Sequence, residues 1–278
     1  MFNHKQEPFN DNCPFPNDAT SDATACRSAA PPASIAKLTQ ASRLLAKWRT
    51  ILLENTLVQN DGENVQSGPF KGMVYAGVTA TEGSRLPRLI GYYERTLRPV
   101  IDEIISRGYP LVIDVGCAEG YYAVGLAMQM PQTRVWARDT NPKAQANCAK
   151  LAALNGVADR IKIGGIITHG DFDICSGQDT IVICDIEGAE RELLDPDKAP
   201  GLLQADILVE SHECDDAGFT ETLWKRFAPT HDVERFDRAV DSSVLPPWME
   251  NLSDLDRLIA LWEWRAGPTP WLWMLCRR

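Results

Sequence analysis

The chain has 278 residues, a hydrophobic content of 44% and a formal net charge of −10. This composition is typical of a globular protein, and no apolar run reaches the ~18–20 residues that a membrane-spanning helix requires. The acidic balance and the lack of a Lys/Arg cluster argue against nucleic acid as a partner. The N-terminus has no apolar segment typical of a secretory signal, and the 8 cysteines form no C-x-x-C pair. We therefore expect a cytoplasmic protein with free thiols and no membrane partner.

The first part of the chain divides into a tail and a helical segment. Residues 1–33 are rich in Asn, Asp, Pro, Ser, Thr and Ala, which bury little apolar surface, so we expect a disordered tail. A helix is predicted from Ile35 to about Val58, preceded by Ser34 as a cap. Its apolar stripe consists of Leu38, Leu45, Trp48 and Leu52. The stripe suits core packing, a cap over the site or a homodimer seam.

The next segment leads into the main domain. Residues 60–84 are rich in turn-forming residues, with a short strand predicted at Val74–Tyr75. A second helix is expected from about Leu86 to Arg107, and Gly108 ends it. We assign residues 34–108 to a helical N-terminal extension.

From residue 111 onward, apolar strand-like runs alternate with helical patterns. The predicted strands are 111–115, 134–139, 161–163, 180–185, 205–210, 232–236 and 271–276. Helices are expected at about 121–127, 141–155, 219–227 and 253–264. Such alternation predicts a mostly parallel sheet with helices on both faces, and the final pair of strands suits an antiparallel C-terminal edge. Residues 109–278 are therefore predicted to form one Rossmann-like α/β domain.

The first strand of this domain runs into a glycine-containing loop with the sequence Asp114-Val115-Gly116-Cys117-Ala118-Glu119-Gly120, and a helix begins at Tyr121. Such a loop lets the backbone approach a ligand, and the helix start offers unpaired N–H groups. The pattern D-x-G-x-x-x-G lacks the middle glycine of the dinucleotide fingerprint G-x-G-x-x-G. Its acid would repel a pyrophosphate and suits an ammonium group, which disfavours a dehydrogenase.

This loop resembles the first motif of the class I S-adenosyl-L-methionine-dependent methyltransferases. The resemblance implies a seven-stranded sheet of the methyltransferase type and S-adenosyl-L-methionine as the cofactor. Asp139 ends the second strand, where an acid accepts hydrogen bonds from ribose hydroxyls. The residues that we predict to bind the cofactor are Asp114, Gly116, Cys117, Ala118, Gly120, Tyr121, Asp139, Asn141 and Asp185.

Two further motifs narrow the resemblance. They are Asp185-Ile186-Glu187-Gly188-Ala189-Glu190 and Glu210-Ser211-His212-Glu213. They are similar to the "D-V-E-G-A-E" and "E-x-H-E" signatures of FkbM-type methyltransferases, which largely modify small molecules and sugars on oxygen. The resemblance covers about residues 68–276 and is strongest over 111–213. The preceding ~60 residues match no known motif, which leaves the acceptor open.

The catalytic residues are predicted from their places at strand ends. If the fourth and fifth strands are neighbours, Asp185, Glu210 and His212 converge beside the sulfonium. His212 is the predicted general base because its unperturbed pKa is ~6.5, and the alternative is a structural histidine. The same three residues offer ligands for Mg²⁺ or Mn²⁺ in a second hypothesis. Glu190 is expected to cap the following helix.

Other residues have two interpretations. The Tyr93-Glu94 pair either reaches the amino end of the cofactor or forms a surface ion pair. Phe70, Met73 and Trp248 either line a substrate pocket or pack against other residues. We predict an O-methyltransferase that acts on a small sugar or natural-product-like acceptor. The alternatives are an N-methyltransferase and a catalytically inactive, cofactor-binding partner protein.

Overall fold

The computed structural model of the chain describes residues 32–212, 218–265 and 267–278. Almost all of the predicted tail over residues 1–33 lies outside these ranges, as does Glu213 of the second motif. The chain forms two units, residues 1–44 and 45–278. Of the first unit, the structure describes residues 32–44, which belong to helix α1 (Pro32–Asp61). Residues 45–108 belong to the same unit as the sheet.

The second unit is built on a seven-stranded sheet in the order β3-β2-β1-β4-β5-β7-β6. Its strands are β1 (Leu111–Val115), β2 (Arg134–Arg138), β3 (Ile161–Gly164), β4 (Thr180–Cys184), β5 (Asp206–Glu210), β6 (His231–Phe236) and β7 (Trp271–Cys276). The first five strands are parallel, and β7 is antiparallel to both β5 and β6. The predicted fold class is confirmed, with the reversed strand lying just inside the edge strand β6.

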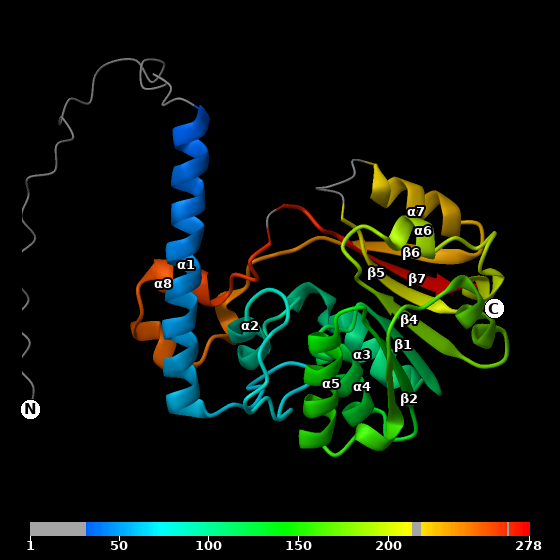
Figure 1. Ribbon diagram of the computed structural model, residues 1–278, viewed down its shortest axis with the longest axis horizontal. Helices are drawn as coiled ribbons and strands as arrows, with labels where there is room; N and C mark the ends of the chain where they lie inside the picture. The colour runs from blue at the N-terminus through cyan, green and yellow to red at the C-terminus, as the bar shows by residue number, and fades with distance from the viewer. Residues whose placement is uncertain (1–31, 213–217, 266) are drawn as a thin grey trace, which may run out of the picture. The chain divides into compact units, whose positions relative to one another are not determined.

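Helices cover both faces of this sheet (Figure 1). Helices α3, α4 and α5 lie on one face, and α6 and α7 lie on the other. The helices are α2 (Arg85–Ile90), α3 (Arg98–Arg107), α4 (Tyr121–Gln129), α5 (Pro142–Leu154), α6 (Glu190–Leu193), α7 (Phe219–Phe227) and α8 (Asp254–Ala260). The 3₁₀ turns are η1 (Arg95–Leu97), η2 (Ala158–Arg160), η3 (His169–Ser176), η4 (Pro200–Gln204), η5 (Ser242–Val244) and η6 (Pro247–Asn251).

The core has two parts because side chains of each strand alternate between the faces. In β1, Val112 packs with the apolar residues of α3, α4 and α5, whereas Leu111, Ile113 and Val115 pack with those of α7. All five residues of β1 are buried, as expected for a central parallel strand. The loop that follows β1 therefore begins from a buried, fixed strand.

The predicted second helix, 86–107, is interrupted. Helix α2 ends at Gly91, whose φ of 81° is left-handed, and Glu94 has a φ of 49° before η1 begins. A side chain on Gly91 would overlap the carbonyl of Ser67, so the chain turns here at a position that only glycine fits. The break places Tyr93 and Glu94 in a turn rather than on a helix face. Nearby, the strand expected at Val74–Tyr75 is a single bridge between Asn64 and Val74.

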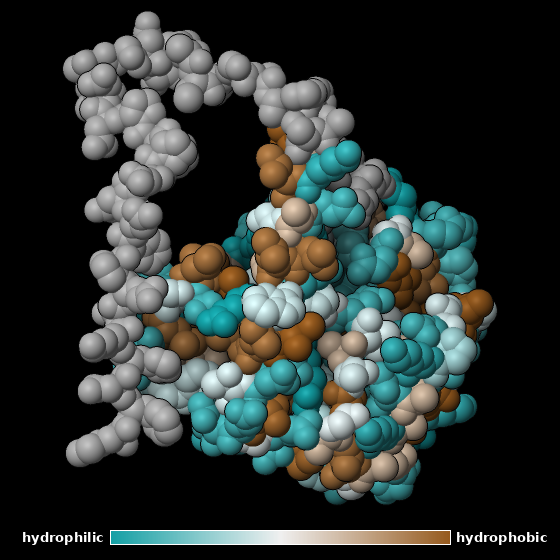
Figure 2. Space-filling view, turned by 60° about the vertical axis from the view of Figure 1, so that its left-hand side comes forward, coloured by the Kyte–Doolittle hydropathy of each residue, from teal (hydrophilic) through white to brown (hydrophobic). Residues whose placement is uncertain are grey.

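The apolar stripe predicted on α1 does not pack in the core. Leu45 and Trp48 are 65% and 57% exposed, whereas Thr50, Leu53 and Leu57 are buried. Hydrophobic side chains are visible among the exposed ones in Figure 2. The packed face of the helix is therefore rotated from the predicted one, and the homodimer seam stays a prediction.

Two general expectations can be compared with the described residues. None of their helices is long and apolar enough to cross a membrane. Cys117, Cys148, Cys175, Cys184 and Cys276 lie in the described ranges, and each carries a free thiol.

We expect Gly116→Ala to destabilise the fold much more than Gly108→Ala. Both glycines have left-handed φ values, 80° and 67°, which cost an L-residue about 1–2 kcal/mol. A Cβ at Gly116 would lie 1.6 Å from the carbonyl oxygen of Asp185, whereas one at Gly108 meets nothing within 4 Å. Urea unfolding should show a loss for Gly116→Ala at least about 2 kcal/mol larger. Equal losses would contradict the close approach of β1 and β4.

Candidate active site

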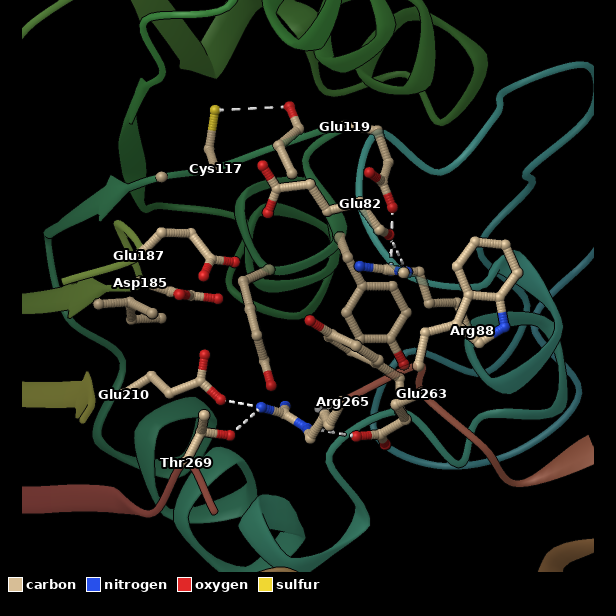
Figure 3. A pocket seen from close by; sticks show the side chains of 18 of the residues that line it. Glu82, Arg88, Cys117, Glu119, Asp185, Glu187, Glu210, Glu263, Arg265 and Thr269 are labelled. Atoms are coloured by element: carbon tan, nitrogen blue, oxygen red, sulfur yellow. Dashed lines mark hydrogen bonds and ion pairs between the residues drawn. The ribbon is translucent and has the colours of Figure 1, made fainter. Parts of the chain in front are cut away.

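The strand register brings the ends of β1, β4 and β5 together, and two of them carry acidic residues. Val115 is paired with Cys184, and Cys184 with Val209, so Asp185 follows β4 between the ends of β1 and β5. The N–H of Asp185 donates to the carbonyl of Val115 over 2.9 Å. Because parallel strands end at one edge, Asp185 and Glu210 lie side by side there (Figure 3), and Gly116 closely approaches the backbone of Asp185.

A first cavity of about 350 Å³ opens at this edge. Its lining carboxylates are Glu82, Asp114, Glu119, Asp185, Glu187, Glu210 and Glu263. Its cationic residues are Lys47, Arg88, Arg265 and, when protonated, His212. Aromatic rings complete the wall, contributed by Tyr93, Tyr121, Tyr122, Trp264 and Trp271. The first cavity is thus acidic on one side and aromatic on another.

Two other cavities adjoin the first. The second cavity, of about 670 Å³, lies over β2 and β3 and is lined by Asp139, Ile166 and Ile167 among others. It shares Glu82, Gly116, Asp185 and Glu187 with the first cavity. The third cavity, of about 330 Å³, shares Glu263, Arg265, Thr269 and Trp271 with the first. The three cavities therefore form a row along the carboxyl ends of the strands.

The glycine loop is held in place by Asp139. One carboxylate oxygen of Asp139 accepts the N–H of Ala118 at 2.9 Å, and the other accepts the N–H of Asn141 at 2.7 Å. Ala118 has a φ of 46°, a left-handed conformation that exposes the backbone of the loop to the cavity. A carboxylate oxygen can accept more than one hydrogen bond, so Asp139 keeps acceptor capacity toward the second cavity.

Asp114 lies beneath the loop and is only 3% exposed. Its Oδ2 has no hydrogen-bond partner among the described residues. Burial raises the pKa of Asp114 to about 7, although a hydrogen bond from the Ala123 backbone works in the opposite direction. A positively charged ligand in the first cavity would therefore stabilise this carboxylate.

His212 is surrounded by carboxylates. Its Nε2 lies 3.2 Å from Glu187 and 3.5 Å from both Asp185 and Glu210, and its Nδ1 lies 3.0 Å from Glu190. Burial alone would lower the pKa of His212, but Glu187, Glu190 and Glu210 outweigh it and raise the pKa to about 11. The ring is therefore an imidazolium at neutral pH. A base role for His212 requires prior loss of this proton.

Glu190 has the capping role that the sequence predicts. Its two carboxylate oxygens accept the N–H groups of Ile186 and Gly188, both at 2.8 Å, in the turn just before α6. Glu190 is fully buried and also faces His212. It therefore fixes the turn that carries Glu187 and holds the imidazolium from behind.

Arg265 is the second cation of the cluster and closes the wall between the first and third cavities. Its guanidinium contacts Glu94 at 2.6 Å and Glu263 at 2.9 Å, and it also contacts Glu210. Burial raises the pKa of Glu94 to about 7 even though Arg265 lowers it. Tyr93 lines the first cavity, whereas Glu94 lies behind it as a partner of Arg265. The predicted surface ion pair of Glu94 is thus a buried one.

Strained backbone gathers at this site. Among the described residues, four non-glycine residues have left-handed φ values: Glu94, Ala118, Glu187 and Trp264. Ala118, Glu187 and Trp264 line the first cavity, and Glu94 contacts its wall through Arg265. Such conformations cost about 1–3 kcal/mol each and persist at functional sites. Their clustering makes the first cavity the candidate functional site.

Most of the predicted site residues meet at these cavities. Those that line the first or second cavity are Asp114, Gly116, Cys117, Ala118, Tyr121, Asp139, Asp185, Glu210 and His212. Gly120 and Asn141 line neither. Gly120 turns the loop into α4 with a φ of 93°, and the side chain of Asn141 caps α5 by accepting the N–H of Lys143. For these two residues the geometry shows structural roles.

Phe70, Met73 and Trp248, which were expected either to line a substrate pocket or to pack, line none of the three cavities. Phe70 and Met73 are buried in the core, and Trp248 donates a hydrogen bond to Asp61. The residues that sequence reasoning missed are Glu82, Arg88, Arg265, Glu263 and Trp271. Trp271 is the first residue of β7, and the other four come from segments outside the strands, where no spacing rule applies. An arginine within an aromatic run such as 262–265 is nevertheless a usable signal.

Two sets of possible metal ligands occur among the described residues, each close enough together to hold an ion. One set is Glu94, Asp185 and Glu210, and the other is Asp185, Glu190 and His212, each with ligand atoms within 4.8 Å of one another. Neither is the predicted set of Asp185, Glu210 and His212, although the two sets together contain it. Arg265 contacts two members of the first set, so an ion there would have to replace its guanidinium.

Comparisons with known proteins give only distant similarities. No protein-family model matches the sequence, and no curated protein matches it. The fold is similar to an O-methyltransferase from Bacillus cereus in complex with SAH, at 10% identity and a TM-score of 0.46 over 73% of this chain and 86% of that one. It is also similar to the O-methyltransferase TomG from Streptomyces achromogenes in complex with SAM, at 13% identity and a TM-score of 0.47 over 70% and 87%.

A human methyltransferase 10 domain containing protein has 15% identity and a TM-score of 0.44 over 82% of this chain and 95% of that one. Similarities this low transfer no function, so the assignment depends on the geometry of the site.

We expect the imidazole of His212 to stay protonated from pH 6 to 9 in chelator-treated protein, because the surrounding carboxylates raise its pKa to about 11. Its proton, and the stability that the proton contributes, should be lost only as the pH rises toward that value. Buried His231, by contrast, has a lowered pKa and should be neutral above its ordinary value of ~6.5. Two-dimensional ¹H–¹⁵N NMR of the ring nitrogens distinguishes the two. Titration of His212 near pH 6.5 would show that the carboxylate cluster is wrongly placed.

Proposed function

We propose that this chain is an S-adenosyl-L-methionine-dependent methyltransferase. The observation that carries the proposal is the pair of adjoining cavities at the carboxyl ends of β1, β2 and β4, with a free oxygen of Asp114 beneath one and Asp139 beside the other. The cofactor has an amino-acid end, a sulfonium and a nucleoside. In this arrangement the nucleoside occupies the second cavity and the amino-acid end occupies the first.

The charges of the site support this cofactor over a dinucleotide. The first cavity is lined by carboxylates, and Glu82, Asp185 and Glu187 stand where the two cavities adjoin. A pyrophosphate at that point would face three acids, whereas a sulfonium would be attracted to them. In the second cavity Asp139 accepts ribose hydroxyls, and Ile166 and Ile167 offer an apolar surface to the adenine ring.

Methyl transfer asks little more of the protein than alignment. The acceptor attacks the methyl carbon in line, the carbon–sulfur bond breaks, and its electron pair stays on the sulfur of S-adenosylhomocysteine. A hydroxyl acceptor also gives up a proton, which the cluster of Asp185, Glu210 and His212 receives. Since His212 is already protonated, we assign the first acceptance to a carboxylate, with the imidazolium stabilising the developing negative charge.

For the acceptor we retain the predicted class, a small sugar or natural-product-like molecule methylated on oxygen, as the FkbM-like resemblance implies. The third cavity is consistent with a small organic acceptor, because Tyr92, Trp262 and Trp271 line it and its volume suits such a ligand. An N-methyltransferase would need no base, and an inactive cofactor-binding protein would bind the cofactor without turnover. The tests of the cluster below distinguish these alternatives.

We expect Asp139→Ala to weaken the binding of S-adenosylhomocysteine at least tenfold. The change removes the acceptor for ribose hydroxyls and the partner of the Ala118 N–H, and charge-assisted hydrogen bonds contribute ~1.5–3 kcal/mol. Isothermal titration calorimetry measures the affinity. Asp232→Ala, at an exposed strand aspartate paired with Arg277, is the control and should bind as the wild type does. Unchanged affinity in Asp139→Ala would place the ribose elsewhere.

We expect His212→Ala to lower turnover by about 10²–10⁴-fold, the usual contribution of general acid–base groups. Turnover is followed as S-adenosylhomocysteine release on an acceptor found by screening small hydroxylated and amine-bearing molecules. If no metal takes part, EDTA leaves the rate unchanged. If proton transfer passes through neutral His212, the rate rises with pH toward its pKa of about 11.

The metal alternative makes a different set of predictions. With Mg²⁺ or Mn²⁺ between enzyme and acceptor, EDTA abolishes turnover, added metal restores it, and Asp185→Asn and Glu210→Gln are as damaging as His212→Ala. We expect the metal-free outcome. A His212→Ala enzyme with wild-type turnover would refute both versions. A product methylated on nitrogen would show that the enzyme is an N-methyltransferase, not an O-methyltransferase.

A further inference from the structure

The third cavity carries an excess of positive charge, whereas the first cavity is acidic. Its lining contains three arginines, Arg95, Arg238 and Arg265, and two carboxylates, Glu94 and Glu263. The lining of the first cavity contains more carboxylates than cations, and the whole chain has a net charge of −10. An excess of arginine in one cavity of so acidic a chain indicates a ligand of negative charge.

The positive charge that remains for a ligand lies at one end of the third cavity. Arg265 is neutralised within the protein, because its guanidinium contacts three glutamates and also the hydroxyl of Thr269 (Figure 3). The excess therefore resides on Arg95 and Arg238. Neither of these two residues lines the first cavity, so both lie away from the wall that the two cavities share.

The protein compensates these two arginines only weakly. Arg95 is half-buried, and its Nη2 lies 3.4 Å from Oδ2 of Asp241, which does not line the cavity. The Nε of Arg95 is buried and has no hydrogen-bond partner among the described residues. Arg238 is exposed, and no hydrogen bond or ion pair joins its side chain to another residue within 32–212, 218–265 and 267–278. Both guanidinium groups therefore keep N–H donors for a ligand.

A tyrosine fixes the two segments that carry these arginines. The hydroxyl of Tyr92 donates to the carbonyl of Ala239 at 2.8 Å and accepts the N–H of Asp241 at 3.4 Å. Arg238 directly precedes this contact, and Arg95 begins η1. Tyr92 and Ala239 are 147 residues apart along the chain, so the contact brings two distant segments together at one rim of the cavity. The arginines are thus presented by a fixed rim.

The rest of the lining suits a flat organic molecule. It is mostly apolar and aromatic and includes Tyr92, Ala239, Val240, Leu258, Leu261, Trp262 and Trp271. Aromatic walls pack well against an aromatic ring, and a cavity of about 330 Å³ suits a small ligand. At the other end, Thr269 and Trp271 line the third and the first cavity alike. A ligand that fills the third cavity therefore reaches from the arginines to the first cavity.

We propose that the third cavity binds a methyl acceptor with an aromatic body and an anionic group, carboxylate or phosphate, at the end remote from the methylated oxygen. Arg95 and Arg238 bind the anionic group, the aromatic walls bind the body, and the hydroxyl lies at the wall shared with the first cavity. This inference rests on the proposed function and names the acceptor class that the sequence leaves open. Arg95 and Arg238 are then specificity-determining residues.

The experiment compares four phenols that differ in the charge of the group opposite the hydroxyl. They are anionic 4-hydroxyphenylacetate and 4-hydroxybenzylphosphonate, neutral 4-hydroxyphenylacetamide and cationic tyramine. Ligand-observed NMR measures their affinities for the wild-type chain, with and without saturating S-adenosylhomocysteine. The preferred anion should bind about 5- to 30-fold more tightly than the amide, because charge-assisted bonds at a partly exposed site contribute less than buried ones. Tyramine should bind most weakly, and the better of the two anions distinguishes carboxylate from phosphate.

Variants assign the preference to the two arginines. Arg95→Gln and Arg238→Gln should each reduce the ratio of anion to amide affinity, and the double variant should abolish it while binding the amide as the wild type does. Arg98→Gln is the matched control, because it removes the same charge from an exposed residue of α3 that pairs with Asp102 and does not line the cavity. This control should keep the wild-type ratios.

Each outcome supports or overturns the proposal. Equal affinities of the wild type for anions and amide, tighter binding of tyramine, or no detectable binding of either anion would overturn it. A preference that persists in the folded double variant would overturn it as well, and if that variant does not fold, the wild-type series decides. Calorimetry with S-adenosylhomocysteine alone tests the proposed function separately. A chain that binds this ligand but shows no anion preference refutes only the present inference, whereas a chain that does not bind it refutes both.

Discussion

The site depends on two cations, buried His212 and partly buried Arg265, that hold an excess of carboxylates at one edge of the sheet. Six carboxylates surround His212 and Arg265: Glu94, Asp185, Glu187, Glu190, Glu210 and Glu263. Without these cations, carboxylates at such short separations would repel one another, and the buried ones would take up protons. Burial and the neighbouring Glu210 and Glu94 already raise the pKa of Asp185 well above its ordinary value. The cluster is therefore held together but not neutralised.

Residues 75–88, which precede the sheet in the sequence, contribute side-chain and backbone contacts to the site itself. Glu119, in the glycine loop, binds the hydroxyl of Tyr75 and the N–H of Thr81, and it pairs with Arg88. Through these contacts residues 75–88 hold the loop after β1 at Glu119, and Asp139 holds it at Ala118. Ligand-binding loops held on two sides lose little entropy on binding, which favours affinity.

The sequence predicts the sheet and the strand-end acids because both follow from short-range rules. Alternating apolar runs define the strands, and parallel strands end at one edge, so the meeting of Asp185, Glu210 and His212 could be foreseen. The position of Arg265 could not, because its partner Glu94 is 171 residues away along the chain. The predicted second helix breaks at Gly91, a residue type that does signal a helix end, and the left-handed φ of Glu94, which no residue type signals, completes the turn before η1. The sequence also did not predict that His212 is protonated, because the ordinary pKa of histidine does not include the effect of four neighbouring carboxylates.

Under the proposed function, the surplus of negative charge also affects the relative affinity of the site for the cofactor and for its product. S-Adenosyl-L-methionine carries a sulfonium that its product S-adenosylhomocysteine lacks, so methyl transfer removes one positive charge from beside Asp185 and Glu210. Two unit charges 4 Å apart interact by roughly 4 kcal/mol at the effective dielectric of a protein surface, and less when they are solvated. An acidic wall therefore favours the cofactor over its product at the sulfur.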